Sequence, residues 1–309
     1  MAFLSHRQGL SLAILCALFP CLFHASSTSD DPPTTYRTGS SEVRISFFAT
    51  DERGRPVQNL SQDDFAIVDD DIVIRDFRSL MRASDTALDL VLLVDDSESV
   101  APRFQQLQQS ILKVISSESL FANDRVSVVT FAGMRPTIFC MRDCAAPATR
   151  ERLLAAKAQG ATPLFDAVSY TAHLVTSQRD ASARQVVILF SDGHDTISMA
   201  SYRDALQAMI ATGALLYTVH VDRSQDPFSP DSRALRQMAE STGGRGFELA
   251  DHAVDLLDAV LADLHASYIV TYQLPSRKAG FHSLRILPKH NLNLQFHCRK
   301  GYNYDNEDR

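Results

Sequence analysis

The hydrophobic residues of this chain gather in short runs that are typical of buried strands. Residues 88–94 (LDLVLLV) and 186–190 (VVILF) are almost continuously apolar. Such runs favour strands that are buried on both faces of a parallel sheet, since a half-exposed strand would alternate apolar and polar positions. The two runs therefore predict two core strands of an α/β domain.

Helical spacing separates these two predicted strands. Phe104, Leu107, Ile111 and Ile115 recur three or four positions apart, as expected for one buried face of a helix. A second helix is predicted over 164–174 (LFDAVSYTAHL), with the preceding proline as its first residue. The alternation of strands and helices predicts a doubly wound α/β fold with a mostly parallel, Rossmann-like central sheet.

A different pattern precedes this domain. Apolar and mostly polar positions alternate over 43–49, which predicts a half-buried strand. Residues 65–68 and 72–74 flank Asp69–Asp71 and predict a hairpin. We expect the three acids to be a solvated turn, with a Ca²⁺ site as the alternative. Residues 41–83 are thus predicted to form a small β domain.

Oxygen-bearing side chains stand next to the predicted core elements. Asp95, Ser97 and Ser99 follow the first strand, Asp192 follows the second, and Thr162 precedes the second helix. Open α/β sheets bind ligands at the carboxyl ends of their strands. Mg²⁺ prefers such oxygen ligands, with Mn²⁺ or Ca²⁺ as alternatives. Because two carboxylates only balance a divalent charge, the ion would remain electrophilic toward a further carboxylate.

These five residues resemble the metal-ion-dependent adhesion site of the von Willebrand factor type A (VWFA) domain family, which is also found in integrin inserted domains. The family pattern is DxSxS, then a threonine, then an aspartate, and all five positions match in that order. The similarity runs from about Leu88 to His265 and includes ALLYTVHVD (214–222) and STGGRGFELA (241–250). It implies a VWFA fold over 86–266, a bound divalent cation, and a partner protein whose Asp or Glu completes the coordination.

Glu98 departs from this pattern, because the family usually has glycine between the two serines. Its carboxylate either points to solvent or crowds the sixth coordination position, and both remain open. A DxSxS motif alone is weak evidence for metal, since Asp and Ser are common in turns. The alternative for Asp95 and Asp192 is that they cap the following helices. His194 and Asp195 are either part of the rim or ordinary loop residues.

Both flanks of the domain resemble an exported bacterial family known as VWFA-related domain proteins. The similar segments are GRPVQNLSQDDFAIVDD (54–70) before the domain and, after it, 268–272, 281–286 and 299–302. That family has no agreed activity. We expect a C-terminal β extension over 267–309 that packs with the N-terminal β domain.

The N-terminal residues predict export. His6 and Arg7 precede an apolar stretch over 10–23 that ends near small residues, as in a secretory signal peptide. We assign the signal peptide to 1–27 and a linker rich in Ser, Thr, Pro and Asp to 28–40. The expected location is periplasmic or secreted, without a transmembrane segment.

Three cysteines remain beyond the predicted signal peptide. Cys140 and Cys144 are close enough in sequence to form a disulfide in an oxidising compartment, which would leave Cys298 unpaired. Three unpaired cysteines are the alternative, and the sequence does not decide between them.

Composition and missing motifs limit the function classes. The net charge of −7 argues against nucleic acid and against a polybasic membrane patch. The sequence contains no GxSxG, Walker A, GxGxxG or HExxH motif, so we predict that the protein is not an enzyme. The sequence favours a metal-dependent protein-binding (adhesion) module, with a structural envelope scaffold whose metal site is only stabilising or degenerate as the alternative.

Overall fold

The computed structural model describes residues 42–304 except 84–85, 118–119, 121–122, 143, 181–182, 222–227 and 250–252. The predicted signal peptide (1–27) and linker (28–40) lie outside the described residues.

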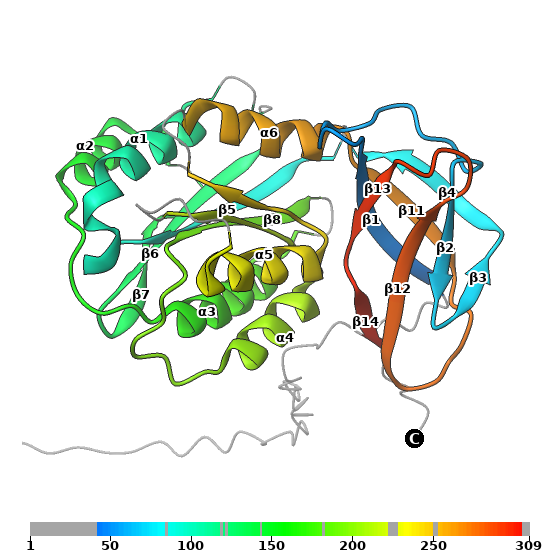
Figure 1. The fold of residues 1–309 in the computed structure, drawn as a ribbon. Coiled ribbons are helices and arrows are strands. Elements are labelled where there is room, and N and C mark those ends of the chain that lie inside the picture. Colours follow the sequence, from blue (N-terminus) through cyan, green and yellow to red (C-terminus); the bar gives the residue numbers. More distant parts are fainter. Residues whose placement is uncertain are drawn as a thin grey trace, which may run out of the picture. The chain divides into compact units, whose positions relative to one another are not determined.

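A six-stranded sheet forms the centre of the α/β domain (Figure 1). Its strand order is β10-β9-β8-β5-β6-β7, and all neighbours are parallel except β7, which runs antiparallel to β6. The predicted mostly parallel α/β sheet is confirmed. The strands are β5 (Leu88–Asp95), β6 (Arg125–Ala132), β7 (Arg135–Cys140), β8 (Arg184–Ser191), β9 (Leu215–His220) and β10 (Gly246–Glu248).

Helices cover both faces of this sheet, as the doubly wound prediction requires. Hydrophobic residues of the first helical group pack in one core cluster and those of the second group pack in another. The first group is η2 (Glu98–Arg103), α1 (Phe104–Ile115), α2 (Pro147–Ala155) and α6 (Ala253–His265), and the second is α3 (Leu164–Ser177), α4 (Tyr202–Thr212) and α5 (Pro230–Thr242).

The central strand β5 explains the continuous apolar run in the sequence. Leu90 and Leu92 belong to the first core cluster, whereas Val91 and Leu93 belong to the second. Successive side chains of a strand point to opposite faces, and here both faces are covered by helices. All eight residues of β5 are buried, so every position of the strand gains from being apolar.

The start of α3 differs slightly from the sequence prediction. Pro163 is the N-cap residue, with φ −90° and ψ 59°, and Leu164 begins the helix. The backbone leaves the helical region one residue later than the periodicity indicated. Proline is still suited to this place because the amide groups at a helix start have no partner within the helix.

Two four-stranded antiparallel sheets form a β-sandwich from the two flanks of the α/β domain. Their strand orders are β13-β1-β11-β4 and β14-β12-β2-β3. The early strand β1 pairs with the late strands β11 and β13, and β2 pairs with β12. The strands are β1 (Glu42–Thr50), β2 (Phe65–Asp69), β3 (Ile72–Ile74), β4 (Phe77–Arg82), β11 (Tyr268–Gln273), β12 (Gly280–Pro288), β13 (Gln295–Cys298) and β14 (Gly301–Tyr304).

Aromatic side chains from distant parts of the sequence fill the sandwich core. The Phe47 ring lies 5.0 Å from the Phe65 ring and 5.7 Å from the Tyr268 ring, measured between centroids. All three residues are buried. Burial of such large apolar surfaces stabilises the sandwich only when both flanks of the chain are folded.

The predicted hairpin around Asp69–Asp71 is confirmed. Strands β2 and β3 pair antiparallel, with Asp69 opposite Ile72. The two loop residues, Asp70 and Asp71, have φ values of 46° and 67°. Positive φ at both positions is the signature of a type I′ turn, whose twist suits a two-residue hairpin.

The chain enters and leaves the α/β domain at one place. Strand β4 comes just before the domain and β11 just after it, and the two strands pair antiparallel. Beyond the end of this ladder, the Ala83 amide donates to the Ser267 carbonyl at 2.8 Å. The entry and exit segments of the domain therefore lie side by side.

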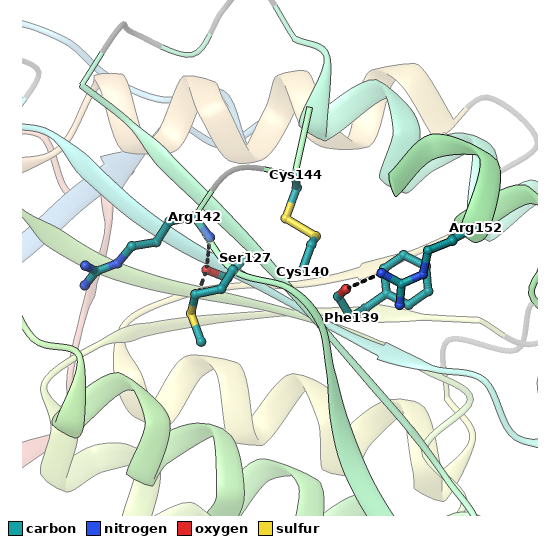
Figure 2. The surroundings of a disulfide bond; sticks show 7 residues. Ser127, Phe139, Cys140, Arg142, Cys144 and Arg152 are labelled. Carbon is teal, nitrogen blue, oxygen red and sulfur yellow. Dashed lines mark hydrogen bonds between the residues drawn. A yellow bond between two sulfur atoms is a disulfide. The ribbon is translucent and has the colours of Figure 1, made fainter. Parts of the chain in front are cut away.

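Cys140 and Cys144 form a disulfide at the end of β7 (Figure 2). Of the two alternatives that the sequence left open, the structure has the bonded one. Cys298 is unbonded, and burial raises the pKa of its thiol to about 11. On the far side of the disulfide, the Arg152 guanidinium lies 4.5 Å from the centre of the Phe139 ring.

Candidate metal centre

The candidate site lies where the strand order of the central sheet reverses. β5 has β6 on one side and β8 on the other, and Val94 is opposite Phe190. Asp95 is the last residue of β5, and Asp192 directly follows β8. This is the switch point at which doubly wound sheets form a crevice beyond the carboxyl ends of their strands. The structure thus brings the two aspartates to one edge.

Asp95 has a buried carboxylate that no described basic residue neutralises. Its Oδ1 accepts the Ser97 amide at 3.0 Å, and its Oδ2 accepts the Ser191 hydroxyl at 2.7 Å. Burial, with a further contribution from the Asp192 charge, raises the pKa of Asp95 to about 7. A carboxylate that is costly to ionise in isolation is stabilised when a cation binds to it.

The two serines of the motif lie next to each other. The Ser97 and Ser99 hydroxyl oxygens are 3.1 Å apart. Ser97 is buried, whereas Ser99 is exposed. This pair continues the run of oxygen atoms from the buried Asp95 outward, which is the donor type that hard divalent cations select.

The Thr162 loop is fastened to the DxSxS loop by backbone hydrogen bonds. The Glu98 amide donates to the Gly160 carbonyl at 2.9 Å, and the Gln159 amide donates to the Asp96 carbonyl at 2.7 Å. Gly160 has φ +93°, and a Cβ there would lie 3.3 Å from the Gly133 nitrogen. Glycine is therefore favoured at this position.

Thr162 is also tied to the loop that carries Asp192. The Thr162 amide donates to the Thr196 hydroxyl at 2.7 Å, and the Thr196 amide donates back to the Thr162 carbonyl at 2.9 Å. Thr162 and Asp192 are both buried. The structure thus joins the three loops of the motif into one hydrogen-bonded unit.

A polar network that the sequence analysis missed supports Asp192 from behind. His220 Nε2 lies 3.1 Å from the Asp192 carbonyl, and its Nδ1 lies 2.7 Å from Glu248. The Ser232 hydroxyl donates to the other Glu248 oxygen at 2.7 Å. Both ring nitrogens face acceptors and are satisfied together only when both carry protons. The available sequence signal was that His220 ends the apolar strand at 215–219.

Two other sequence alternatives are decided by the local geometry. The N-cap residues of η2 and α4 are Ser97 and Ser201, so the capping alternative for Asp95 and Asp192 is wrong. His194 is exposed and lies 3.4 Å from Asp231. Asp195 accepts the Phe165 amide at 3.3 Å and therefore anchors its loop to α3.

The donor set fits a hard divalent cation. The residues offer carboxylate and hydroxyl oxygens without nitrogen or sulfur, beside a buried carboxylate that lacks a cationic partner among the described residues. The residues that would hold it are Asp95, Ser97, Ser99, Thr162 and Asp192.

Several solved structures share similarity with this chain at low sequence identity. An aerotolerance-related membrane protein from Bacteroides fragilis NCTC 9343 is 16% identical, with a TM-score of 0.45 over 58% of this chain and 98% of that one. BatB from Bacteroides thetaiotaomicron is 15% identical, with a TM-score of 0.44 over 58% and 98%. Manganese-loaded TRAP protein from Plasmodium vivax is 16% identical, with a TM-score of 0.47 over 78% and 100%.

The sequence comparisons identify the family. No curated protein matches the chain significantly. The profile of the von Willebrand factor type A domain, however, matches residues 89–260, which is more than half of the chain. Domains of this type typically serve as metal-dependent adhesion or protein-interaction modules and are generally not enzymes. With its central sheet, its helices on both faces and this match, the chain belongs to the von Willebrand factor type A domain family.

Proposed function

We propose that this protein is an exported protein-binding module that captures its partner through a divalent cation. Asp95, Ser97, Ser99, Thr162 and Asp192 bind Mg²⁺, directly or through water, and Mn²⁺ or Ca²⁺ can replace it. An Asp or Glu side chain of the partner protein completes the coordination. The observation that carries this proposal is the buried Asp95 carboxylate, which has no ion pair with a described basic residue.

The charge of the site supports capture of a carboxylate. Asp95 and Asp192 together supply two negative charges, and the remaining three side chains are neutral hydroxyls. A divalent ion held by this set has little excess negative charge around it, so a further carboxylate is attracted. More acidic ligands would favour retention of the ion and repel an acidic partner.

Glu98 is compatible with this function. Its backbone amide is used to hold the Thr162 loop, while its side chain is exposed. An exposed carboxylate costs little in solvation and is screened by salt. We therefore expect Glu98 to weaken the approach of an acidic partner without preventing metal binding.

Export to the periplasm or beyond the cell is part of the proposal. The Cys140–Cys144 disulfide supports it, because disulfides persist in oxidising compartments and are rare in the cytosol. The signal-like N-terminal sequence agrees with it. No helix in the described part of the chain has the length and apolar character needed to cross a membrane.

Calorimetric titration with Mg²⁺ and Mn²⁺ tests the metal site. We expect saturable binding by the wild type and its loss in Asp95→Ala. Asp231→Asn is the matched control, since it removes one negative charge near His194 without removing a motif residue. Equal binding by wild type and Asp95→Ala would refute the site. Absence of binding in wild type that is restored by Glu98→Gly would identify a degenerate site.

A pull-down with and without chelator then separates the two functional hypotheses. The binding-module proposal predicts that partner capture is lost with EDTA and with Asp192→Ala. The scaffold alternative predicts that chelation lowers the melting temperature while partner binding persists.

A further inference from the structure

The β-sandwich contains a second cluster of metal-ligand side chains, separate from the VWFA site. Asp69 ends β2, Asp70 lies in the β2–β3 turn, and His282 lies in β12. One carboxylate oxygen from each aspartate and one nitrogen of the histidine lie within 4.8 Å of one another. Asp69 and His282 are almost wholly buried, and the Asp70 side chain is 33% exposed.

Two buried atoms of this cluster point at each other without a hydrogen bond. Asp69 Oδ1 and His282 Nδ1 have no hydrogen-bond partner among the described residues. His282 Nδ1 lies 3.5 Å from Asp69 Oδ1 and 3.3 Å from Asp70 Oδ2. These separations exceed the usual range for an N–H···O bond. Leaving such buried polar atoms unmatched is costly.

The second polar atom of each residue is held in place. His282 Nε2 lies 2.7 Å from the Lys278 carbonyl, so Nε2 carries the proton in the neutral ring and Nδ1 presents a lone pair. Asp70 Oδ1 accepts the Ser283 amide at 2.9 Å. A backbone carbonyl that fixes the far nitrogen of a histidine is the usual support of a metal-binding imidazole.

Two tyrosines hold the buried Asp69 carboxylate. Tyr272 and Tyr302 donate their hydroxyls to Asp69 Oδ2 at 2.7 and 2.8 Å. Burial and the Asp69 carboxylate raise the pKa of both hydroxyls, so they keep their protons as donors. The Tyr302 ring also stacks on His282 at 5.1 Å. Asp69 Oδ1 is left as the free ligand atom.

We propose that Asp69, Asp70 and His282 bind one divalent transition-metal ion, with Zn²⁺ as the preferred species. Two donor atoms that are each about 2.1 Å from one ion at tetrahedral or octahedral angles lie about 3.0–3.4 Å apart, which is close to the observed separations. One imidazole nitrogen among carboxylate oxygens favours Zn²⁺ over Mg²⁺ and Ca²⁺. The exposed side of Asp70 leaves room for water as a further ligand.

The ligands come from opposite flanks of the α/β domain, and the ion thereby joins them. Asp69 and Asp70 belong to the segment before the domain, whereas His282 belongs to the segment after it. Asp69 is opposite Leu284 in the β2–β12 ladder. An ion that binds only the folded cluster stabilises this pairing by mass action.

The competing explanation is a protonated His282 that neutralises the two carboxylates without metal. Titration of the purified wild-type protein with Zn²⁺ in excess Mg²⁺ distinguishes the two, because Mg²⁺ occupies the oxygen-only VWFA site. We expect one saturable Zn²⁺ site and a rise in melting temperature of about 5 °C or more at saturation. Absence of such binding would overturn the proposal in favour of the protonated histidine.

Matched variants locate the site. Asp70→Asn should weaken Zn²⁺ binding at least about 10-fold, and asparagine suits the positive φ of residue 70, so the hairpin is retained. Asp71→Asn removes the same charge from the next residue, whose side chain is 89% exposed, and should bind Zn²⁺ as wild type does. Equal affinity of wild type and Asp70→Asn, or equal losses in both variants, would also overturn the proposal.

Discussion

The α/β domain and the β-sandwich both place carboxylates at the end of a strand, but they assemble their clusters differently. In the α/β domain, strand order at the switch point brings Asp95 and Asp192 together, and short loops supply the remaining oxygens. In the sandwich, Asp69 meets His282 only because β2 pairs with β12. The first site therefore depends on the geometry of a parallel sheet, whereas the second depends on pairing between the two flanks of the domain.

The largest effect should come from removing the aromatic core that joins these flanks. Phe65→Ala should lower the free energy of unfolding by about 3–5 kcal/mol, because Phe65 is fully buried against Phe47. Urea unfolding measures this change. Phe281→Ala, which shortens a ring residue that is 54% exposed, is the control and should cost much less. Equal losses would show that sandwich packing is not concentrated in its core.

The pH dependence of the sandwich should be the next largest effect. Burial, with a smaller contribution from Arg245, lowers the pKa of His297 to about 4. The unfolded state then binds a proton that the folded state does not, so stability falls as pH drops from about 6.5 to about 4. The loss should reach about 2–3 kcal/mol.

Urea unfolding across this pH range, in wild type and in His297→Gln, checks the assignment. The glutamine variant should show a flatter decline because the titrating group is absent. An unchanged slope in His297→Gln would assign the acid sensitivity to other groups.

The disulfide should have a smaller effect, because it closes a short loop at the edge of the central sheet. Replacing both Cys140 and Cys144 with serine should cost about 2 kcal/mol, from the entropy of a loop with a sequence separation of 4. Calorimetric melting of the double variant, with and without reductant, measures it. Reductant should lower the melting temperature of wild type alone, and an equal response of both proteins would contradict the prediction.

The smallest expected change concerns the network behind Asp192. His220→Gln should weaken Mg²⁺ binding about 10-fold, because it loosens the Asp192 carbonyl without removing a proposed ligand. Calorimetry with His194→Gln as the matched control measures this, since His194 is exposed and lies in the same loop. If both variants bind Mg²⁺ as wild type does, the network supports the fold rather than the metal.

The fold of the α/β domain could be predicted because its signals are local. Every residue of β5 is buried, and α1 buries the four apolar residues whose spacing predicted it. The loops of the candidate centre follow directly from these elements. By contrast, the support of Asp192 by His220 depends on the order of β8 and β9 in the sheet, and periodicity does not encode that order.

The sandwich cluster was not predictable for a related reason. The Asp69–Asp71 run indicated a turn, which the structure confirms, and a solvated acidic tip was the expected environment. Asp69 is instead buried, because β12 and two tyrosines from later strands cover it. A local pattern predicts the turn, but burial is decided by residues more than two hundred positions away in sequence.

The adjacent entry and exit of the α/β domain have a mechanical consequence. Since β4 and β11 pair antiparallel and both lead into the domain, a pull on the metal edge by a bound partner loads these two strands from the same end. Their hydrogen bonds would then open one after another, starting at the Ala83–Ser267 contact, instead of sharing the load along the ladder. Under tension, the domain should peel away from the sandwich at low force before either part unfolds.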